Sequence, residues 1–337
     1  MKALVYDGPW QMPLRDHPSP VPQQGEVLVR VQAAGICGSD VHGFTGSTGR
    51  RTPGVVMGHE FCGVIEALGE ETADRTPGER VVVQPIISCA QCAECLAGRA
   101  NLCLQRRGIG WSVDGGYAEL VRVPSRNALP LPSEISWHEG AMIEPLAVAL
   151  HAVNLTPLDF GQTVVVLGAG PIGLLCVLAL KLRGAGRVLV SDLSAHRLQL
   201  ARQLGADLTL PADGDPVNEV RRLTGNHGAD AVLEAVGLEV TAAQSLQMVR
   251  NGGAVTWVGN SAPTVRISMQ EIVTREITVR GAYAFTAEFA AAMTLLRSGR
   301  LNLTPLIEHV APLHEGPQLV RDLARGQLDA VKVVLEP

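Results

Sequence analysis

The chain has 337 residues, of which 46% are hydrophobic and 18% are charged, and its formal net charge is −5. A chain of this length favours two domains. The negative charge excludes a basic surface for nucleic acid or an anionic membrane, and the aromatic content of 4% is too low for a base-stacking surface. We therefore predict no nucleic-acid partner and no membrane partner.

The N-terminal segment, residues 1–7, has the composition of a first strand, and no apolar stretch with a small-residue cleavage site follows it. We therefore expect no signal peptide and a cytoplasmic location. Residues 160–180 carry no charged side chain, and such a run is long enough to cross a bilayer. The four glycines and one proline in that run instead favour a strand, a glycine turn and the start of a helix.

Residues 1–150 contain short β-like segments that glycine and proline interrupt. Residues 25–31 place apolar side chains at alternate positions, which is typical of a half-buried strand. Residues 77–83 combine a Pro-Gly turn with another strand. This part of the chain predicts a β-barrel whose loops carry the chemistry.

Residues 160–285 have a different pattern, in which strands alternate with helices. Residues 164–167 form a continuous apolar run, as in a strand covered on both faces, and residues 171–183 have helical length and composition. A second strand over 187–192 precedes Ser194, which can cap a helix that runs to residue 204. The further segments that we expect are strands at 231–236, 254–258 and 331–335 and helices at 287–298 and 314–325. The alternation predicts an α/β fold with a parallel, doubly wound sheet.

Four of the seven cysteines lie within fifteen residues, at Cys89, Cys92, Cys95 and Cys103. Short Cys-x-x-Cys steps let one small loop supply four sulfur ligands to a tetrahedral zinc ion. Disulfide pairing is the alternative, but the lack of a secretory signal favours reduced thiols that hold a metal. Because four protein ligands leave no open position, this loop predicts a structural zinc, and metal chemistry would require a second site.

A glycine-rich motif of the form G-x-G-x-x-G follows the strand at 164–167 and opens the next helix. Its residues are Gly168, Gly170, Pro171, Ile172 and Gly173. Missing β-carbons let the backbone approach a pyrophosphate at the helix N-terminus. A tight turn that binds nothing is the simpler alternative.

Asp192 ends the second strand of this region and can accept hydrogen bonds from the adenosine ribose hydroxyls. Its charge would repel a 2′-phosphate, so the sequence favours NAD over NADP. Arg197 complicates this prediction, because it can bind such a phosphate, pair with Asp192 or lie along the adenine.

Three further residues suggest an open metal site. Cys37 lies in a G-x-C-G-S-D-x-H segment, and His59 and Glu60 lie in a G-H-E segment. Thiolate, imidazole and carboxylate groups all bind zinc. Glu144 is a further acid in an otherwise apolar stretch. Taken singly, Cys37 is more often a small core residue and His59 a loop residue, but their occurrence beside the cysteine loop and the nucleotide motif favours a metal site.

Together these motifs resemble those of the zinc-dependent medium-chain dehydrogenases, in the alcohol dehydrogenase superfamily, over nearly the whole chain. Segments 143–148, 168–173 and 191–198 are most similar to the sorbitol (polyol) dehydrogenase branch. The resemblance implies a GroES-like catalytic domain over 1–150, completed by 286–337, and a Rossmann NAD-binding domain over 151–285. It also implies two zinc ions per subunit, NAD as the cofactor, and a homotetramer or homodimer.

Carried over by position, the resemblance makes Cys37 and His59 direct ligands of the catalytic zinc. Glu60 is then a ligand or alternates with water, and Glu144 is a nearby acid or an exchanging ligand. The implied substrate is a polyol or related secondary alcohol, oxidised reversibly to a ketone. Acidifying its hydroxyl to near pH 7 requires about 11 kcal/mol, which a zinc Lewis acid can supply and a hydrogen bond of about 1–3 kcal/mol cannot.

Ser39 and His42 are the residues that the resemblance implies for proton transfer. Ser39 would take the hydroxyl proton and relay it to His42 and solvent. The two residues lie three positions apart, so one helical turn brings them to the same face. The alternative is that Ser39 caps a helix and His42 is a surface residue.

Two departures from the sorbitol-specific pattern bear on the substrate. That pattern expects an aromatic residue directly after the relay histidine, where this chain has Gly43, and an arginine where it has Ala284. Both changes remove polar contacts to a long polyol, so a different polyol, a cyclitol or a smaller diol fits equally well. Phe44, Trp111 and Glu144 are candidates for the pocket wall, with Tyr283 and Phe285 nearby at the domain junction.

Other functions remain open. Segments 305–309 and 320–325 are similar to galactitol-1-phosphate dehydrogenases, and a phosphate could then contact Arg50, Arg51, Arg106 and Arg107, although solvated loop charges are the simpler interpretation. Butanediol and threonine are further candidate substrates, but the segment that begins at Glu144 differs from threonine dehydrogenases. A catalytically silent NAD-binding structural protein is the last alternative, and the presence of Cys37, Ser39 and His59 argues against it.

Overall fold

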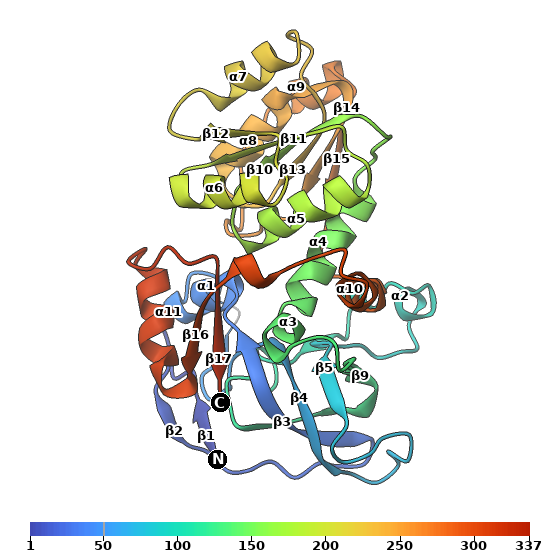
Figure 1. Cartoon of the computed structure of the whole chain (residues 1–337), viewed down its shortest axis with the longest axis vertical. Helices are drawn as coiled ribbons and strands as arrows, with labels where there is room; N and C mark the ends of the chain where they lie inside the picture. The colour runs from blue at the N-terminus through green and yellow to red at the C-terminus, as the bar shows by residue number, and fades with distance from the viewer. Residues whose placement is uncertain (50) are drawn as a thin grey trace. The chain divides into compact units, whose positions relative to one another are not determined.

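The computed structural model describes residues 1–49 and 51–337, and the chain divides into two compact units (Figure 1). The first unit holds Met1–Glu144 and Phe289–Pro337, and the second holds Pro145–Glu288. The chain leaves the first unit inside helix α4 (Ile143–Leu155) and returns to it inside helix α10 (Glu288–Arg297). From the resemblance we expected these breaks after residues 150 and 285.

The first unit is built on a seven-stranded sheet in the order β16-β17-β3-β4-β5-β9, with β8 also paired to β3. Its strands are β3 (Glu26–Gly35), β4 (Glu60–Leu68), β5 (Arg80–Val83), β8 (Leu120–Pro124), β9 (Ala128–Pro130), β16 (Ile307–Pro312) and β17 (Lys332–Glu336). All pairs are antiparallel except β16 with β17. Because β17 pairs with β3, the C-terminal tail completes the sheet that the N-terminal residues begin.

Strand β3 is buried at most positions, and not at alternate ones as its sequence predicted. Val27, Leu28 and Val29 are all buried. The reason is its central place: β4, β8 and β17 pair with its edges, helix α3 (Trp137–Ala141) packs against β3 and β4, and Val27 and Val29 lie in the apolar core of the unit. A strand that is covered on both faces can carry a continuous apolar run.

Short elements complete the first unit, with η marking a 3₁₀ helix. They are β1 (Lys2–Leu4), β2 (Leu14–Asp16), α1 (Gly38–Thr45), β6 (Ile86–Ile87), α2 (Ala93–Leu96), η1 (Ala100–Leu102), β7 (Arg107–Gly108), η2 (Ser125–Asn127), η3 (Thr304–Leu306), η4 (Leu313–Glu315) and α11 (Gly316–Ala324). Strand β1 pairs with β2, and β6 pairs with β7. The strand expected over residues 1–7 is shorter, because beyond Leu4 the chain continues with an isolated bridge between Val5 and Val56.

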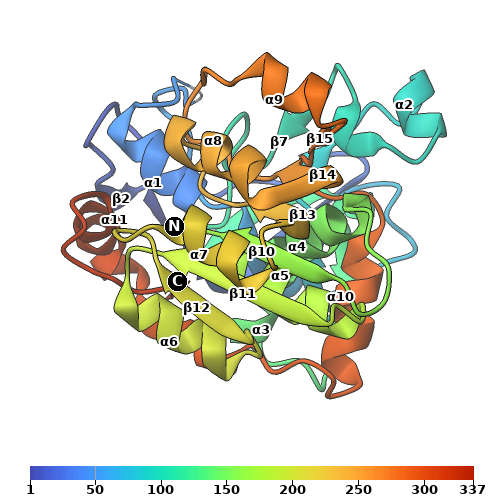
Figure 2. The same cartoon turned by 90° about the horizontal axis from the view of Figure 1, so that it is seen from above.

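The second unit is a six-stranded sheet in the order β12-β11-β10-β13-β14-β15, with every pair parallel. Its strands are β10 (Thr163–Leu167), β11 (Arg187–Asp192), β12 (Leu208–Pro211), β13 (Ala229–Glu234), β14 (Val249–Trp257) and β15 (Thr278–Gly281). Besides most of α4, its helices are α5 (Pro171–Leu182), α6 (Ala195–Gln203), α7 (Pro216–Leu223), α8 (Glu239–Met248) and α9 (Met269–Thr274). Helices α5 and α6 cover one face, and α7 and α8 cover the other (Figures 1 and 2). The doubly wound parallel sheet that the sequence predicted is confirmed.

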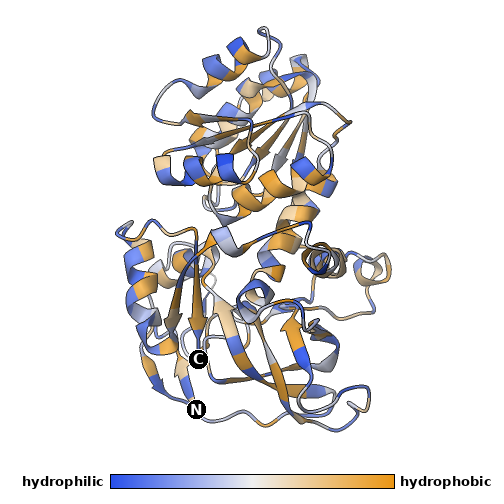
Figure 3. Ribbon diagram, in the orientation of Figure 1, coloured by the Kyte–Doolittle hydropathy of each residue, from blue (hydrophilic) through white to orange (hydrophobic). Residues whose placement is uncertain are grey.

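Apolar residues line the strands of this second sheet (Figure 3). Val164, Val165 and Val166 of β10 are fully buried, as a strand with helices on both faces requires. The sheet order sets the carboxyl ends of β10 and β11 side by side, which is where the glycine motif and Asp192 lie. In the described residues, no helix is long and apolar enough to cross a membrane.

Candidate functional site

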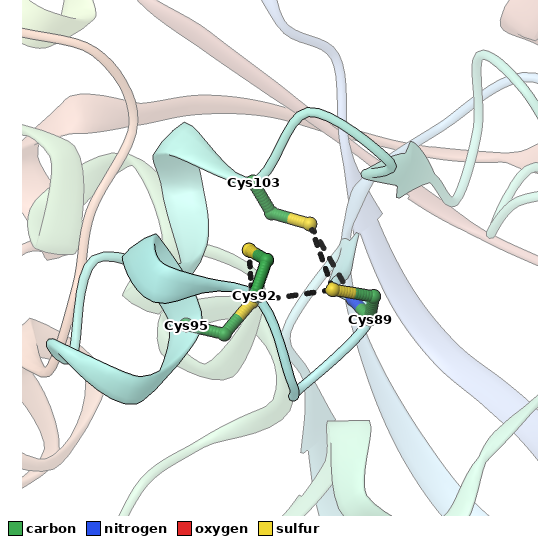
Figure 4. A group of neighbouring side chains, drawn as sticks. All are labelled: Cys89, Cys92, Cys95 and Cys103. Atoms are coloured by element: carbon green, nitrogen blue, oxygen red, sulfur yellow. Dashed lines mark hydrogen bonds between the residues drawn. The ribbon is translucent and has the colours of Figure 1, made fainter.

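The four-cysteine loop brings its thiols together from a single short segment (Figure 4). Cys92 caps helix α2, Cys95 lies inside that helix, and Cys103 follows η1. The sulfur of Cys89 lies 3.5 Å from that of Cys103 and 3.9 Å from that of Cys95, and Cys92 lies 3.5 Å from Cys95. All seven cysteines are free thiols, whereas a disulfide would require sulfur atoms about 2 Å apart.

These distances fit a tetrahedral zinc ion. Zinc–sulfur bonds of about 2.3 Å place the four sulfurs of a regular tetrahedron about 3.8 Å apart. Backbone N–H groups of Gln91 and Cys92 lower the pKa of the Cys89 thiol to about 6. The thiolate is the form that binds metal, so Cys89 is prepared for binding. A backbone hydrogen bond from Cys95 lowers the pKa of Cys92, but side-chain hydrogen bonds from its neighbours outweigh it and raise that pKa to about 11, so a metal would have to displace the proton of that thiol.

The second group of possible ligands comes from two neighbouring strands. The register of β3 and β4 pairs Gly35 with Glu60. Cys37 lies just beyond the end of β3 and caps helix α1, and His59 lies just before β4. One ligand atom from each of Cys37, His59 and Glu60 lies within 4.8 Å of the other two. Three ligands of this kind are the set that a catalytic zinc uses, and they leave a position for substrate.

Asp40 organises this site from within helix α1, and it is completely buried. Its Oδ1 lies 3.3 Å from Nδ1 of His59, although the alignment is too poor for a hydrogen bond. Its Oδ2 accepts a hydrogen bond of 2.8 Å from the Tyr117 hydroxyl. Burial alone would raise the pKa of Asp40, but His59 and Arg51 outweigh it and hold that pKa well below its usual range.

His59 is correspondingly affected by its neighbours. Burial would lower the pKa of His59, but the Asp40 carboxylate and Cys37 raise it well above its usual value. A metal ion must therefore displace a proton from His59, since only the neutral ring is a ligand. The Asp40 contact at Nδ1 leaves Nε2 as the ring nitrogen for the metal.

Glu60 forms a buried ion pair that the sequence did not lead us to expect. Its Oε2 lies 2.6 Å from Nζ of Lys332, and both side chains are 1% exposed. Lys332 also donates to the carbonyl oxygen of Ile36, 3.2 Å away. Burial lowers the pKa of Lys332, but Glu60 more than compensates and raises it. The pair places a cation from the last strand, β17, beside the three possible metal ligands.

Glu144 is buried near this group but lies outside the set of three ligand atoms. Burial raises its pKa to about 7, with His59 and Lys332 opposing the shift and Glu60 adding to it. Glu144 therefore faces the charges of the site, as an acid close to the metal would.

The two proton-transfer candidates lie on one helix. Ser39 and His42 are three residues apart in α1, and both side chains are exposed. The hydroxyl of Ser39 donates to Sγ of Cys37 at 3.4 Å. Cys37, and not Ser39, is the cap of this helix. Surrounding protein atoms lower the pKa of His42, although its side chain reaches solvent.

The glycine motif forms the turn between β10 and α5. Gly168 has a φ of +93°, a conformation that glycine adopts without strain, and a β-carbon on Gly173 would lie 1.8 Å from the Gly168 carbonyl oxygen. A β-carbon on Gly170 would meet only Nη1 of Arg197, at 3.9 Å. Pro171 and Ile172 open helix α5, which Gly170 caps. The turn therefore leaves room above Gly170, beside an arginine and a helix N-terminus, for an anionic group.

Asp192 ties this turn to the next strand. Its Oδ2 accepts a hydrogen bond of 2.6 Å from the backbone N–H of Ala169, and its Oδ1 accepts one of 2.8 Å from that of Ser194. Each oxygen keeps a second lone pair for a ribose hydroxyl. Ser194 caps helix α6, as predicted, by accepting from the N–H of Arg197.

The aromatic residues proposed for the pocket wall and the arginines proposed for a phosphate differ in their burial and contacts. Phe44 is buried and packs edge-on against Trp10, so it belongs to the core and not to a pocket wall. Trp111 is half-buried, with its ring 5.7 Å from that of His59. Of the arginines proposed for phosphate, Arg51 pairs with Asp40, and Arg50 lies outside the described residues.

Sequence reasoning missed Asp40, Tyr117 and Lys332 as parts of the site. Asp40 lies inside the segment that supplied Cys37 and Ser39, so its position was a usable signal. Lys332 is a single charged residue within the apolar run 330–335, and such a lysine usually has a buried partner. Nothing in the sequence distinguishes Tyr117.

Comparison with known proteins agrees with this description. Residues 23–133 match the alcohol dehydrogenase GroES-like domain, and residues 171–298 match the zinc-binding dehydrogenase domain. Sorbitol dehydrogenase of Halalkalibacterium halodurans is 34% identical, over 100% of this chain and 99% of that protein.

Solved structures are similar over the same extent. A zinc-binding dehydrogenase of Sinorhizobium meliloti, solved with NADP bound, has a TM-score of 0.93 and 35% identity, over 100% of this chain and 99% of that one. Galactitol-1-phosphate dehydrogenase of Escherichia coli has a TM-score of 0.93 and 31% identity, over 100% of both chains. With the two zinc-ligand groups and the doubly wound sheet, these matches identify the chain as a member of the zinc-dependent medium-chain dehydrogenases, in their sorbitol dehydrogenase-like branch.

Proposed function

We propose that this protein catalyses the reversible, zinc- and NAD-dependent oxidation of a secondary alcohol of a polyol to a ketone. The observation that carries the proposal is the group of Cys37, His59 and Glu60, whose ligand atoms lie within 4.8 Å of one another. Sorbitol dehydrogenase, a relative along the whole chain, supports a polyol as the substrate class.

The residues of this group have distinct tasks in the proposed reaction. Cys37 and His59 would hold the metal, and the Asp40 carboxylate lies 3.3 Å from Nδ1 of the His59 ring. When bound, zinc supplies Lewis-acid polarisation of the substrate hydroxyl, and NAD accepts the hydride. Glu60 would be the most weakly held of the three ligands, because Lys332 already neutralises its charge.

Ser39 and His42 carry the proton that the hydroxyl loses. Ser39 lies beside Cys37, with 3.4 Å between the hydroxyl oxygen and Sγ, so it is the hydroxyl nearest to the metal ligands on helix α1. A lowered pKa keeps His42 neutral at pH 7, and a neutral imidazole can accept a proton. Its exposure lets the proton continue to solvent. One proton leaves the oxygen, and one hydride leaves the carbon with its electron pair.

The arginines support an unphosphorylated substrate. Arg51 is engaged with the buried carboxylate of Asp40, and Arg106 donates to the carbonyl oxygen of Cys103. Arg106 and Arg107 are both exposed and are therefore solvated surface charges. A phosphate ester would therefore find little preformed positive charge from these residues.

A screen for NADH production tests the proposed function. The purified enzyme is incubated with NAD or NADP and with polyols, cyclitols, sugar phosphates, threonine and short diols. We expect NAD reduction with a polyol or cyclitol and weaker reduction with phosphorylated substrates. An enzyme that holds two zinc ions but reduces neither nucleotide with any secondary alcohol would contradict the proposal.

We also propose a homo-oligomer, either a tetramer or a dimer. The support is the resemblance to the medium-chain dehydrogenases. Light scattering coupled to size-exclusion chromatography measures the mass directly, and a mass equal to the 35.7 kDa of one chain would contradict this proposal.

A further inference from the structure

We propose that Arg51 is a positioning residue for the open metal site. Position 43 is then glycine because Arg51 fills the space that a side chain at position 43 would occupy. The inference rests on the proposed function, since it takes Cys37, His59 and Glu60 to hold the catalytic zinc. Neither Arg51 nor Gly43 is itself a possible metal ligand.

Arg51 is an unusually buried arginine. Its side chain is 6% exposed, and its Nη2 donates to Oδ1 of Asp40 at 3.0 Å and to the carbonyl oxygen of Ser39 at 3.3 Å. Its Nε is buried and makes no hydrogen bond to a described residue. Buried arginines are rare unless paired, so the guanidinium is held here for the contact with Asp40.

The path from Arg51 to Asp40 crosses Gly43. Asp40 and Gly43 lie three residues apart on the buried face of helix α1. A β-carbon on Gly43 would lie 2.8 Å from Cγ, 3.0 Å from Nε and 3.2 Å from Cζ of Arg51. Any side chain at position 43 would therefore push the guanidinium away from Asp40.

The contact between Arg51 and Asp40 is important because it pairs a buried positive charge with a buried negative charge. In the described part of the chain, the charged side chains in contact with Asp40 are Arg51 and His59. As a metal ligand, His59 is neutral. Arg51 is then the cation that balances a completely buried carboxylate, and a buried carboxylate without such a partner is strongly unfavourable.

The opposite side of Asp40 has the same construction. Tyr117 donates to Oδ2 of Asp40, and a β-carbon on Gly58 would lie 2.4 Å from Cδ1 of the Tyr117 ring. Each carboxylate oxygen of Asp40 therefore accepts a hydrogen bond from a large side chain, Arg51 or Tyr117. Each of these side chains packs against a glycine, where a β-carbon would leave too little room. Asp40 can therefore keep one orientation, and with it the ring of His59.

The same geometry explains a departure from the sorbitol pattern. An aromatic residue directly after His42 would need the volume that Arg51 fills at Gly43. The loss of that aromatic contact in this chain is accordingly a consequence of how Asp40 is held.

Zinc retention under chelator competition tests this inference in the full-length enzyme. The zinc that is missing from Cys37→Ser identifies the open site, and the other zinc belongs to the four-cysteine loop. We expect Arg51→Met to hold the open-site zinc about 10–100-fold more weakly, the usual effect of removing a group that orients a ligand, and to keep the other zinc unchanged. Arg51→Lys should recover part of the affinity, because it keeps the charge but not the planar fork.

Gly43→Ala is the second variant, and it decides the question if Arg51→Met does not fold. Alanine normally favours a helix over glycine, so a weaker open-site zinc in Gly43→Ala would come from the displaced arginine. Adding Gly43→Ala to Arg51→Met should cause little further loss. Gly38→Ala, in the same helix with open space around its β-carbon, is the matched control.

One result would contradict the role of Arg51, and a different result would contradict the proposed function. If wild type holds two zinc ions and both Arg51→Met and Gly43→Ala retain them as wild type does, Arg51 is not a positioning residue. If wild type holds zinc only in the four-cysteine loop, the proposed function itself fails.

Discussion

The two groups of possible zinc ligands are built in opposite ways. The four-cysteine loop takes all its possible ligands from residues 89–103 and would surround a metal completely. The open site takes Cys37 from the end of one strand and His59 and Glu60 from the start of the next, and its supporting charges come from Arg51 and Lys332. A closed site can be encoded locally, whereas an open site needs the tertiary fold to hold three ligands without a fourth.

Because of this difference, we expect the four-cysteine loop to affect the stability of the protein and the open site to affect its catalytic activity. In the loop the metal itself closes the structure, so its removal should loosen a lobe. In the open site the sheet and the buried ion pairs hold the ligands, so the fold should survive metal loss while activity does not. The following variants test this separation, from the largest expected effect to the smallest.

Cys37→Ser should have the largest effect on activity. Even half of the roughly 11 kcal/mol needed to acidify the hydroxyl corresponds to a loss of turnover of about 10⁴-fold. We expect one zinc per chain in place of two and little change in melting temperature. Steady-state kinetics with metal analysis measures both, and near-wild-type turnover in this variant would disprove the catalytic role of the open site.

Lys332→Met should destabilise the fold, although it replaces none of the proposed metal ligands. It leaves Glu60 as a buried charge without its partner, which typically costs about 3–5 kcal/mol. The matched control is Lys181→Met, because Lys181 forms an exposed pair with Asp207 that contributes about 0–1 kcal/mol. Denaturant unfolding compares the two, and equal stabilities would mean that burial adds nothing to the Lys332 pair.

Cys92→Ser should lower stability and leave the open site loaded. Cross-linking a loop of fifteen residues stabilises a fold by about 3 kcal/mol in chain-entropy terms, and a metal that joins four thiols does at least this. We expect a lower melting temperature, one zinc lost, and NADH production per folded molecule close to wild type. A variant that melts as wild type does would argue against a structural metal.

The same contrast explains what the sequence could predict. Cysteine spacing and the G-x-G-x-x-G pattern are local, so the loop and the turn after β10 were accessible from the residues alone. Asp40 and Lys332 have their roles only through the pairing of β3, β4 and β17. Likewise, the space at Gly43 has meaning only once Arg51 folds over it.

Secondary structure shows a related limit. Strand β14 begins at Val249, five positions before the predicted start, and it includes Gly252 and Gly253. A glycine pair normally predicts a turn. Val249 pairs with Ala229 and Ala254 pairs with Ala231, so residues 250–253 form a bulge without pairing partners on β13, and Gly252 has a φ of +65°. The glycine pair thus interrupts the pairing locally, and the strand continues on both sides of it.

Asp192→Asn tests a case between the two metal sites, because the nucleotide site joins two nearby segments of one sheet. The amide keeps an oxygen for a backbone N–H of Ala169 or Ser194 but loses the charge. A hydrogen bond to a charged group contributes about 1.5–3 kcal/mol, so kcat/KM for NAD should fall about 10–100-fold, while that for NADP should hold or rise. Asp207→Asn is the control, since Asp207 also accepts a backbone N–H of this sheet, from Val188. In this proposal the charge of Asp192 distinguishes NAD from NADP, whereas Asp207 only supports the sheet. A native preference for NADP would rule out Asp192 as the source of cofactor choice. Equal effects of the two substitutions on both nucleotides would also rule it out.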